Sequence, residues 1–301
     1  MSKPRAWLEL TRGANLPTVW SNVLIGWLLS LAAGAALTAG SFTDLGLALL
    51  GASCLYTAGM FLNDAADVEW DRTHRPERPL PLGVLAADTV HRAGLALLVL
   101  GCLACLSISP WVGLAAAGVA GLVLAYTRWH KVHPTAAPLL MGACRSVLPV
   151  LGFLTLPPSA LGDSVPLLFA HALALGGFTA GISLLARHES GRGEPGRLAT
   201  VISYAAVLLV PATLFSQGRP PWLVLVGSCG LVLLLGQSRR WFPLVGDRVA
   251  FRIAALCLLD YLPWLAIRGS FDRTDPLAMG GLMILLFFGT ALALRRLLPS
   301  T

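Results

Sequence analysis

The sequence predicts an all-α protein, a polytopic transmembrane helical bundle of nine or ten spans. The first reason is composition: 56% of the 301 residues are hydrophobic and only 12% are charged, with a mean hydropathy of +0.73. An ordinary soluble domain carries about 25% charged residues. The second reason is a series of long apolar stretches, and the third is an uneven distribution of basic residues. These features exclude an ordinary soluble domain.

Ten apolar stretches approach or reach the length of about 20 residues that crosses the hydrocarbon core as a helix. Small residues in "AAGAALTAG" could suggest a cleaved signal peptide, but the apolar run before them is too long for one. We therefore expect a retained first helix and a single integral membrane domain over residues 1–301. The stretches are residues 17–38, 43–62, 89–108, 110–127, 136–157, 165–186, 199–215, 221–237, 249–267 and 277–294.

The basic residues predict how these helices are oriented. If the N-terminus is cytoplasmic, eighteen of the 22 Lys and Arg residues fall on the cytoplasmic side and three on the other, with Arg145 inside a span. Because Lys and Arg collect in cytoplasmic loops, both termini are expected inside, with ten spans if 249–267 crosses. The net charge of +7 is then mainly a topology signal, with some attraction to anionic membrane lipid. No basic patch is interleaved with aromatics, so no nucleic-acid partner is expected.

An acidic cluster follows the second apolar stretch, in "FLNDAADVEWDRTHRPERPLPLG". At about 100° per residue, Asn63, Asp67 and Asp71 lie at about 0°, 40° and 80° around a helix, and Asp64 at about 100°. Four oxygen-bearing side chains therefore share one helical face. The alternative is a solvated helix end whose acids pair with Arg72, Arg75 and Arg78.

Like charges one helical turn apart repel each other, and more strongly beside hydrocarbon, where the effective dielectric constant falls. A bound cation would relieve this repulsion. Ligands that are all oxygen favour a hard cation, and Mg²⁺ is usually held by one or two carboxylates together with phosphate oxygens of a substrate. The cluster therefore predicts a magnesium site that awaits a phosphorylated ligand.

Other polar residues lie near the same membrane level or inside the spans. The loop "AYTRWHKVHP" places Tyr126, Arg128 and Lys131 around His130. Arg145 lies within a span, at a cost of about 2.5–3.5 kcal/mol on insertion scales, and is expected to pair with phosphate or a carboxylate. For Asp260 and Asn22, also inside spans, structural and functional roles are equally open from the sequence.

Together these features resemble the UbiA superfamily of intramembrane prenyltransferases, and the resemblance spans most of the chain. Its most specific element is NDxxDxxxD, matched here by Asn63, Asp64, Asp67 and Asp71. "RPERPLPLG", "YTRWHK" and "CRSVLPVLG" resemble further family stretches. "RGANLPTVWSNVLIGW" and "ISLLARHE" are similar to the EboC-like branch of the superfamily.

The resemblance implies a helical bundle around a cavity open to lipid, in which Mg²⁺ binds the diphosphate of an isoprenyl chain. Ionisation leaves an allylic cation, which a small lipophilic or aromatic acceptor attacks. It implies Asp64, Asp67, Asp71, Lys131 and Arg145 as catalytic residues. Diphosphate contacts are expected from Asn63, Arg78, Tyr126, Arg128, Arg187 and His188, and metal ligands from Asn63, Asp64, Asp67, Asp71 and Glu189. The implied location is a bacterial inner (plasma) membrane, with the N-terminus cytoplasmic.

The sequence departs from the family pattern in the third loop, "ARHESGRGE". A second Asp-rich motif is expected there, and only Glu189, with Glu194 further on, is left to replace its aspartates. His188 or Arg187 could supply a fixed positive charge instead of a second ion. Two alternatives to transfer therefore stay open, a carrier or transporter of a lipophilic precursor and a terpene cyclase.

Overall fold

The computed structural model describes residues 1–130, 136–156, 164–186, 197–219, 221–268 and 276–297. Within these ranges the chain forms helices and no strand, so the predicted all-α class is confirmed. The helices are α1 (Lys3–Thr11), the 3-10 helix η1 (Gly13–Asn15), α2 (Leu16–Ala32), α3 (Ser41–His74), α4 (Ala87–Leu106), α5 (Pro110–Trp129), α6 (Ala136–Leu154), α7 (Ser164–Ala186), α8 (Arg197–Ser216), α9 (Trp222–Trp241), α10 (Val245–Ala254), α11 (Leu256–Ile267) and α12 (Pro276–Leu297).

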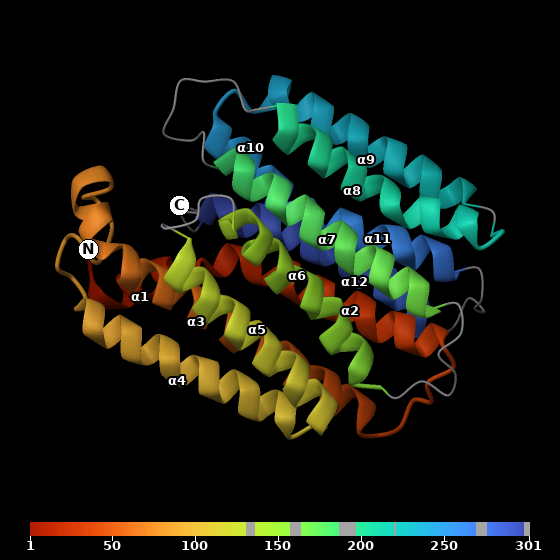
Figure 1. Ribbon diagram of the computed structural model, residues 1–301, viewed down its shortest axis with the longest axis horizontal. Coiled ribbons are helices and arrows are strands. Elements are labelled where there is room, and N and C mark those ends of the chain that lie inside the picture. The colour runs from red at the N-terminus through yellow and green to blue at the C-terminus, as the bar shows by residue number, and fades with distance from the viewer. Residues whose placement is uncertain (131–135, 157–163, 187–196, 220, 269–275, 298–301) are drawn as a thin grey trace.

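The long helices run side by side as one bundle (Figure 1). In the described part, nine helical segments are long and apolar enough to cross a membrane, with α10 and α11 counted together as Val245–Ile267. With 17 residues, α2 is shorter, but it lies inside the bundle and most of its residues are buried. These segments and α2 correspond one to one to the ten predicted stretches. The protein is therefore an integral membrane protein.

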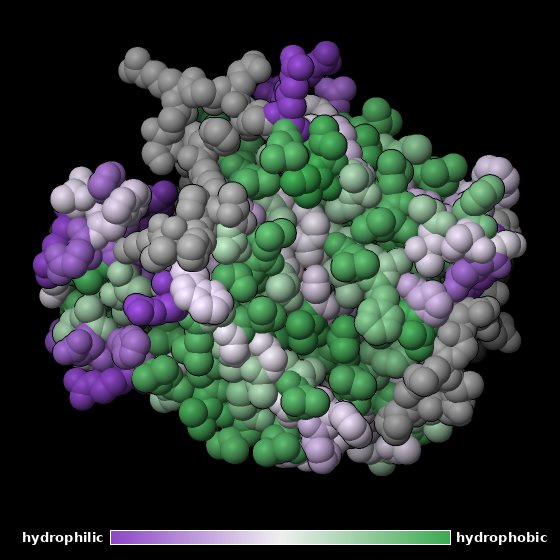
Figure 2. Space-filling model, viewed as in Figure 1, coloured by the Kyte–Doolittle hydropathy of each residue, from purple (hydrophilic) through white to green (hydrophobic). Residues whose placement is uncertain are grey.

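Both ends of the described chain lie at one end of the bundle, as an even number of crossings requires (Figure 1). Arg295, near the end of α12, donates a hydrogen bond to the Asn15 side chain at 2.9 Å. Figure 2 shows apolar side chains over most of the visible face, with the largest group of polar side chains at the end that carries the N-terminus and smaller groups at the upper and right edges.

Two helices end at positions that differ from those of the corresponding apolar stretches. The first helix ends at Ala32 rather than residue 38, because Gly34 turns the chain with a φ of 84°. The second continues well beyond residue 62, to His74. Polar residues follow residue 62, but no helix breaker occurs before Pro76, and the residue before a proline disfavours the helical conformation. The acidic cluster therefore lies on an unbroken helix.

A small hydrophobic cluster, called the α1 cluster here, fixes the polar end of α3. The sequence did not predict α1. Trp7 of α1 lies beside Phe61 of α3, with ring centroids 5.2 Å apart. The buried members of the cluster are Ala6, Leu10, Phe61, Leu80, Leu85 and Val90. It therefore binds α1 and the segment after α3 to the same part of α3.

Helices α2 and α6 approach each other closely at two glycines. A Cβ atom at Gly26 would overlap the carbonyl group of Pro149, and one at Gly152 would overlap the carbonyl group of Val23. Small residues allow such backbone contact between helices in a membrane. This contact holds Asn22 on α2 next to α6.

We expect Gly152→Ala to destabilise the protein, because the added methyl group must push α2 and α6 apart. Overpacking of this kind costs about 1–3 kcal/mol. Thermal unfolding in detergent measures the effect as a lower Tm. Gly118→Ala on α5 is the matched control, since a Cβ atom there meets nothing within 4 Å. Equal Tm values for the two variants would contradict the close contact.

Candidate functional site

The predicted acidic face lies on the last turns of α3. Asp64 and Asp71 are buried, with 4% and 2% of their surface exposed, and Asp67 is partly buried. The alternative of a solvated helix end does not fit this burial, although the pairing that it expected with Arg78 is present, at Asp71. Buried carboxylates need partners, because an isolated buried charge is costly.

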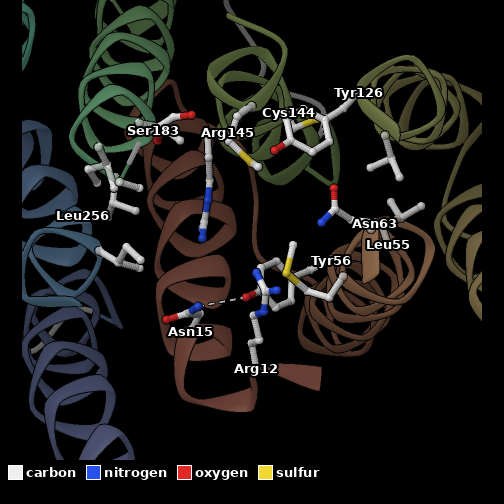
Figure 3. A pocket seen from close by; sticks show the side chains of 18 of the residues that line it. Arg12, Asn15, Leu55, Tyr56, Asn63, Tyr126, Cys144, Arg145, Ser183 and Leu256 are labelled. Atoms are coloured by element: carbon white, nitrogen blue, oxygen red, sulfur yellow. Dashed lines mark hydrogen bonds between the residues drawn. The ribbon is translucent and has the colours of Figure 1, made fainter. Parts of the chain in front are cut away.

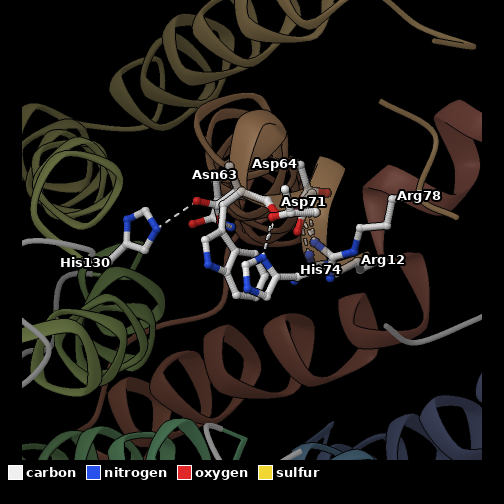
Figure 4. A network of polar contacts seen from close by, with 10 residues as sticks. Arg12, Asn63, Asp64, Asp71, His74, Arg78 and His130 are labelled. Carbon is white, nitrogen blue, oxygen red and sulfur yellow. Dashed lines mark hydrogen bonds and ion pairs between the residues drawn. The ribbon is translucent and has the colours of Figure 1, made fainter. Parts of the chain in front are cut away.

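Two arginines supply these partners, one from each side of α3 in the sequence (Figure 4). Arg12 Nη2 donates to Asp64 Oδ1 at 2.8 Å. Arg78 Nη1 donates to Asp71 Oδ2 at 2.8 Å and lies 3.8 Å from Asp64 Oδ1. The Asp64 carboxylate raises the pKa of the Arg12 guanidinium above its ordinary value. The α1 cluster carries both arginines to this position.

The backbone of Arg12 is itself unusual. It lies in the left-handed region, with φ 46° and ψ 44°, between α1 and η1. This conformation costs a residue with a side chain roughly 1–2 kcal/mol relative to the right-handed one. The following residue, Gly13, has no such restriction. The chain therefore places an arginine where the backbone is strained and the side chain reaches Asp64.

Asp67 has different partners. Asn63 Nδ2 donates to Asp67 Oδ2 at 3.0 Å, and His130 Nε2 lies 3.1 Å from Asp67 Oδ1. The other ring nitrogen of His130 lies 3.0 Å from the Tyr126 carbonyl oxygen, and the two rings stack with centroids 5.1 Å apart. Since both ring nitrogens face acceptors, a protonated His130 beside an ionised Asp67 satisfies both contacts.

The oxygen-bearing side chains at this end of α3 are of the type that binds Mg²⁺, although in this structure the carboxylates pair with arginines and a histidine. Among the described residues, no three His, Cys, Asp or Glu side chains are arranged to hold a metal ion. However, Asn63 Oδ1 is buried and accepts no hydrogen bond from the described residues. This oxygen and the nearby carboxylates are the oxygen ligands that Mg²⁺ prefers. Binding would require the acids to exchange their arginine and histidine partners for the metal.

A cavity of about 350 Å³ begins at the polar end and extends between α3, α5, α6, α7, α10 and α11 (Figure 3). Its polar end is lined by Arg12, Arg75, Arg78 and Asn63. Most of the remaining lining is apolar. The apolar lining residues include Ala52, Leu55, Met60, Val119, Val123, Met141, Leu148, Ile182, Val249, Ile253 and Leu256. The cavity is therefore shaped for an amphiphile with an anionic head.

Arg145 points into this cavity from α6 (Figure 3). Its guanidinium lies 5.8 Å from the centre of the Tyr56 ring, and the Tyr56 hydroxyl accepts a hydrogen bond from Asn15 at 3.0 Å. The protein partner of Arg145 is an amide and not the carboxylate that the sequence suggested. Arg145 Nη1 instead donates to the side-chain oxygen of Asn22 at 2.9 Å.

The remaining predicted site residues divide into three groups. Tyr126 lines the cavity beside Asn63 (Figure 3). Arg128 is exposed and does not line the cavity. The other four lie outside the described residues, and their roles stay predictions: Lys131, Arg187, His188 and Glu189.

Sequence reasoning missed three residues of this site. It treated Arg12 only as a topology signal, gave Asn15 no role and assigned no contact to His130. The signal for Arg12 was weak but present, since "TRGAN" places an arginine and a glycine directly before the first apolar stretch. A turn there, rather than a continuous helix, is what turns Arg12 toward α3.

The sequence of this chain was compared with those of known protein families and of known proteins. The UbiA prenyltransferase family model matches residues 23–256. Relatives named digeranylgeranylglyceryl phosphate synthase occur in Ignicoccus hospitalis, with 37% identity over 129 residues, and in Methanosarcina mazei, with 31% identity over 145 residues. These matches cover 43% and 46% of this chain, and 40% and 50% of the relatives. The chain thus matches no more than half the length of either relative.

Solved structures show the same fold. A UbiA homolog from Aeropyrum pernix K1 superposes with a TM-score of 0.61 at 18% identity, over 83% of this chain and 98% of that one. A UbiA homolog from Archaeoglobus fulgidus bound to DMAPP and Mg²⁺ gives a TM-score of 0.53 at 16% identity, over 97% and 99%. The family model covers most of the chain, and the helical bundle is that of the solved UbiA homologs. The chain belongs to the UbiA prenyltransferase family.

Proposed function

We propose that this protein transfers an isoprenyl group from an isoprenyl diphosphate to a lipophilic acceptor within the membrane, in a Mg²⁺-dependent reaction. The observation that carries the proposal is that Asn63 of the acidic face, together with the two arginines that pair with its acids, lines the polar end of an apolar cavity. An isoprenyl diphosphate has the matching form, a charged head on an apolar chain.

In this proposal Mg²⁺ is held by Asn63, Asp64, Asp67 and Asp71, with Glu189 as a further ligand. The metal would stabilise the negative charge that develops on the leaving diphosphate. Arg12 and Arg78 line the cavity beside the acids and would hold diphosphate oxygens through charge-assisted hydrogen bonds. Lys131, Arg187, His188 and Arg128 stay proposed diphosphate contacts.

Aromatic residues of the chain would stabilise the allylic cation. Tyr56 and Tyr126 both line the cavity, and an aromatic face attracts a cation by about 0.5–2 kcal/mol. The apolar lining keeps water away from the cation, which favours transfer to an acceptor over hydrolysis.

The acceptor is proposed only as a small lipophilic or aromatic molecule. The named relatives make digeranylgeranylglyceryl phosphate, so a glycerophosphate lipid belongs among the acceptors to be tested. We also propose a plasma-membrane location with a cytoplasmic N-terminus and one domain over the whole chain. The relatives are archaeal, so a bacterial membrane and the EboC-like branch stay predictions.

We expect Asp67→Asn to lower Mg²⁺-dependent release of diphosphate by at least about 100-fold, which corresponds to about 2.7 kcal/mol. The variant keeps the shape of the side chain but loses the charge that would bind the metal. Release of labelled diphosphate from several isoprenyl diphosphates, with candidate acceptors, measures the effect. Chelation of Mg²⁺ by EDTA should have the same result in the unchanged protein.

Glu69→Gln is the matched control, since Glu69 lies on the same helix but is exposed and pairs with Arg72 at 2.8 Å. Its release rate should equal that of the unchanged protein. Binding without release, with any acceptor, would favour the carrier, and release without an acceptor would favour the cyclase. Neither binding nor release across all chain lengths would refute the proposed function.

We expect Arg12→Gln to raise the KM for the isoprenyl diphosphate by about 10- to 100-fold, because a hydrogen bond to a charged group contributes about 1.5–3 kcal/mol. Steady-state kinetics at saturating Mg²⁺ measure this change. Arg5→Gln is the control, since Arg5 lies exposed on α1. An unchanged KM in Arg12→Gln would show that Arg12 serves only the ion pair with Asp64.

A further inference from the structure

A second polar cluster lies inside the bundle, away from the acidic face of α3. It joins Ser21 and Asn22 on α2, His171 on α7 and Asp260 on α11. All four residues are 0% exposed. Asp260 Oδ2 accepts hydrogen bonds from Ser21 Oγ at 2.5 Å and from Asn22 Nδ2 at 2.7 Å. Asp260 Oδ1 lies 2.8 Å from His171 Nε2.

The hydrogen bonds assign the proton on His171. His171 Nδ1 is buried and has no hydrogen-bond partner among the described residues. A proton on Nδ1 would therefore be an unpaired buried donor, which is costly. The neutral ring with its proton on Nε2 donates to Asp260 and avoids this cost. Asp260 then carries a negative charge that His171 does not neutralise.

Asn22 connects this carboxylate to the cavity. Its side-chain nitrogen donates to Asp260, and its side-chain oxygen accepts from Arg145 Nη1 at 2.9 Å. The opposite orientation of the amide would place two donors against each other at Arg145 and two acceptors against each other at Asp260. Asp260 and Arg145 therefore favour the same orientation of Asn22, and Asp260 reinforces the contact of Arg145 with the side-chain oxygen.

The negative charge has a second effect on Arg145. A cation inside a span is costly unless it is paired, and Arg145 makes no hydrogen bond to a carboxylate among the described residues. Asp260 lies beyond Asn22, so its negative charge compensates the positive charge of Arg145 without a direct contact to the guanidinium group. The remaining donors of Arg145 stay available to a ligand in the cavity, which it lines beside Tyr56.

We propose that Asp260 is a positioning residue for the anionic part of the cavity's ligand: through Asn22 it holds Arg145 in the orientation that faces that ligand. The proposal rests on the proposed function, since it takes the ligand of Arg145 to be the diphosphate of the isoprenyl substrate. Asp260 itself does not touch the ligand.

Asp260→Asn tests this role with little change in shape. The new amide must set its NH2 group against either His171 Nε2 or Asn22 Nδ2, so the hydrogen bonds that lead to Arg145 are disturbed, and the negative charge is lost. The probe is inorganic pyrophosphate with Mg²⁺, and its Kd is measured by calorimetry on the full chain in detergent. We expect Asp260→Asn to weaken pyrophosphate binding by about tenfold.

The decisive comparison repeats this substitution in a chain that already carries Arg145→Gln. If Asp260 acts through Arg145, the second substitution changes the Kd by less than about twofold, because there is no longer an arginine to position. The same tenfold loss in both backgrounds would overturn the proposal, since it would show a general structural effect. An unchanged Kd on Asp260→Asn in the chain that keeps Arg145 would also overturn it.

Two further variants keep the test valid if Asp260→Asn does not fold. Asn22→Leu leaves both charges but removes the connection, and it should weaken pyrophosphate binding to a similar extent. Ser228→Ala on α9 is the control, since its hydroxyl is buried without a hydrogen-bond partner among the described residues. If the unchanged protein binds no pyrophosphate, the proposed function fails. If it binds and Asn22→Leu binds equally well, only the positioning role fails.

Discussion

The buried carboxylates of α3 are the constraint on which the rest of the site depends. Asp64 and Asp71 lie seven residues apart on one helix, and neither is accessible enough for water to solvate its charge. Each must therefore receive a cation from elsewhere in the chain. Arg12 comes from the segment before α2 and Arg78 from the segment after α3, and both reach the acids at 2.8 Å. The α1 cluster packs the segments that carry both arginines against α3, beside the two acids.

The same constraint explains why the cavity is polar at one end only. The charged pairs lie where α3 extends beyond its apolar part, and the lining between α5, α6 and α7 is mostly apolar. Arg145 is the exception, a cation deeper in the bundle. Its charge is compensated by Asp260 through Asn22 rather than by an acid in the cavity. Arginines therefore line the cavity both at its polar end and deeper in the bundle, whereas the carboxylates near it are held in ion pairs or hydrogen bonds.

The features that could be predicted from the sequence depend only on residues that are close together in the chain. The span positions were predicted because apolar length is a local property, and the shared face of Asn63, Asp64, Asp67 and Asp71 because helical spacing is regular. Arg78 follows the motif closely enough to be read with it. The apolar stretch ends at residue 62, but the helical spacing of the acidic residues already placed them on a helix, which continues to His74 because no breaker precedes Pro76.

The contacts that could not be predicted join residues far apart in the chain. Arg12 and Asp64 are 52 residues apart, and His130 and Asp67 are 63 apart. No periodic pattern links such pairs, because their meeting depends on how α1 and α5 pack against α3. For the same reason, the sequence did not decide between a structural and a functional role for Asp260. Its partners Ser21 and Asn22 are more than 230 residues away and become visible only once α2 and α11 lie together.

The ion pairs also make metal and diphosphate depend on each other under the proposed function. A diphosphate alone would take Arg12 and Arg78 and leave Asp64 and Asp71 buried without a counter-ion. Mg²⁺ alone would take the acids and leave the arginines unpaired at the end of the cavity. When both bind, every charge exchanges one partner for another and none is left unpaired, so the cost of breaking the pairs is met once. Linkage then requires that each ligand raise the affinity for the other by the same factor.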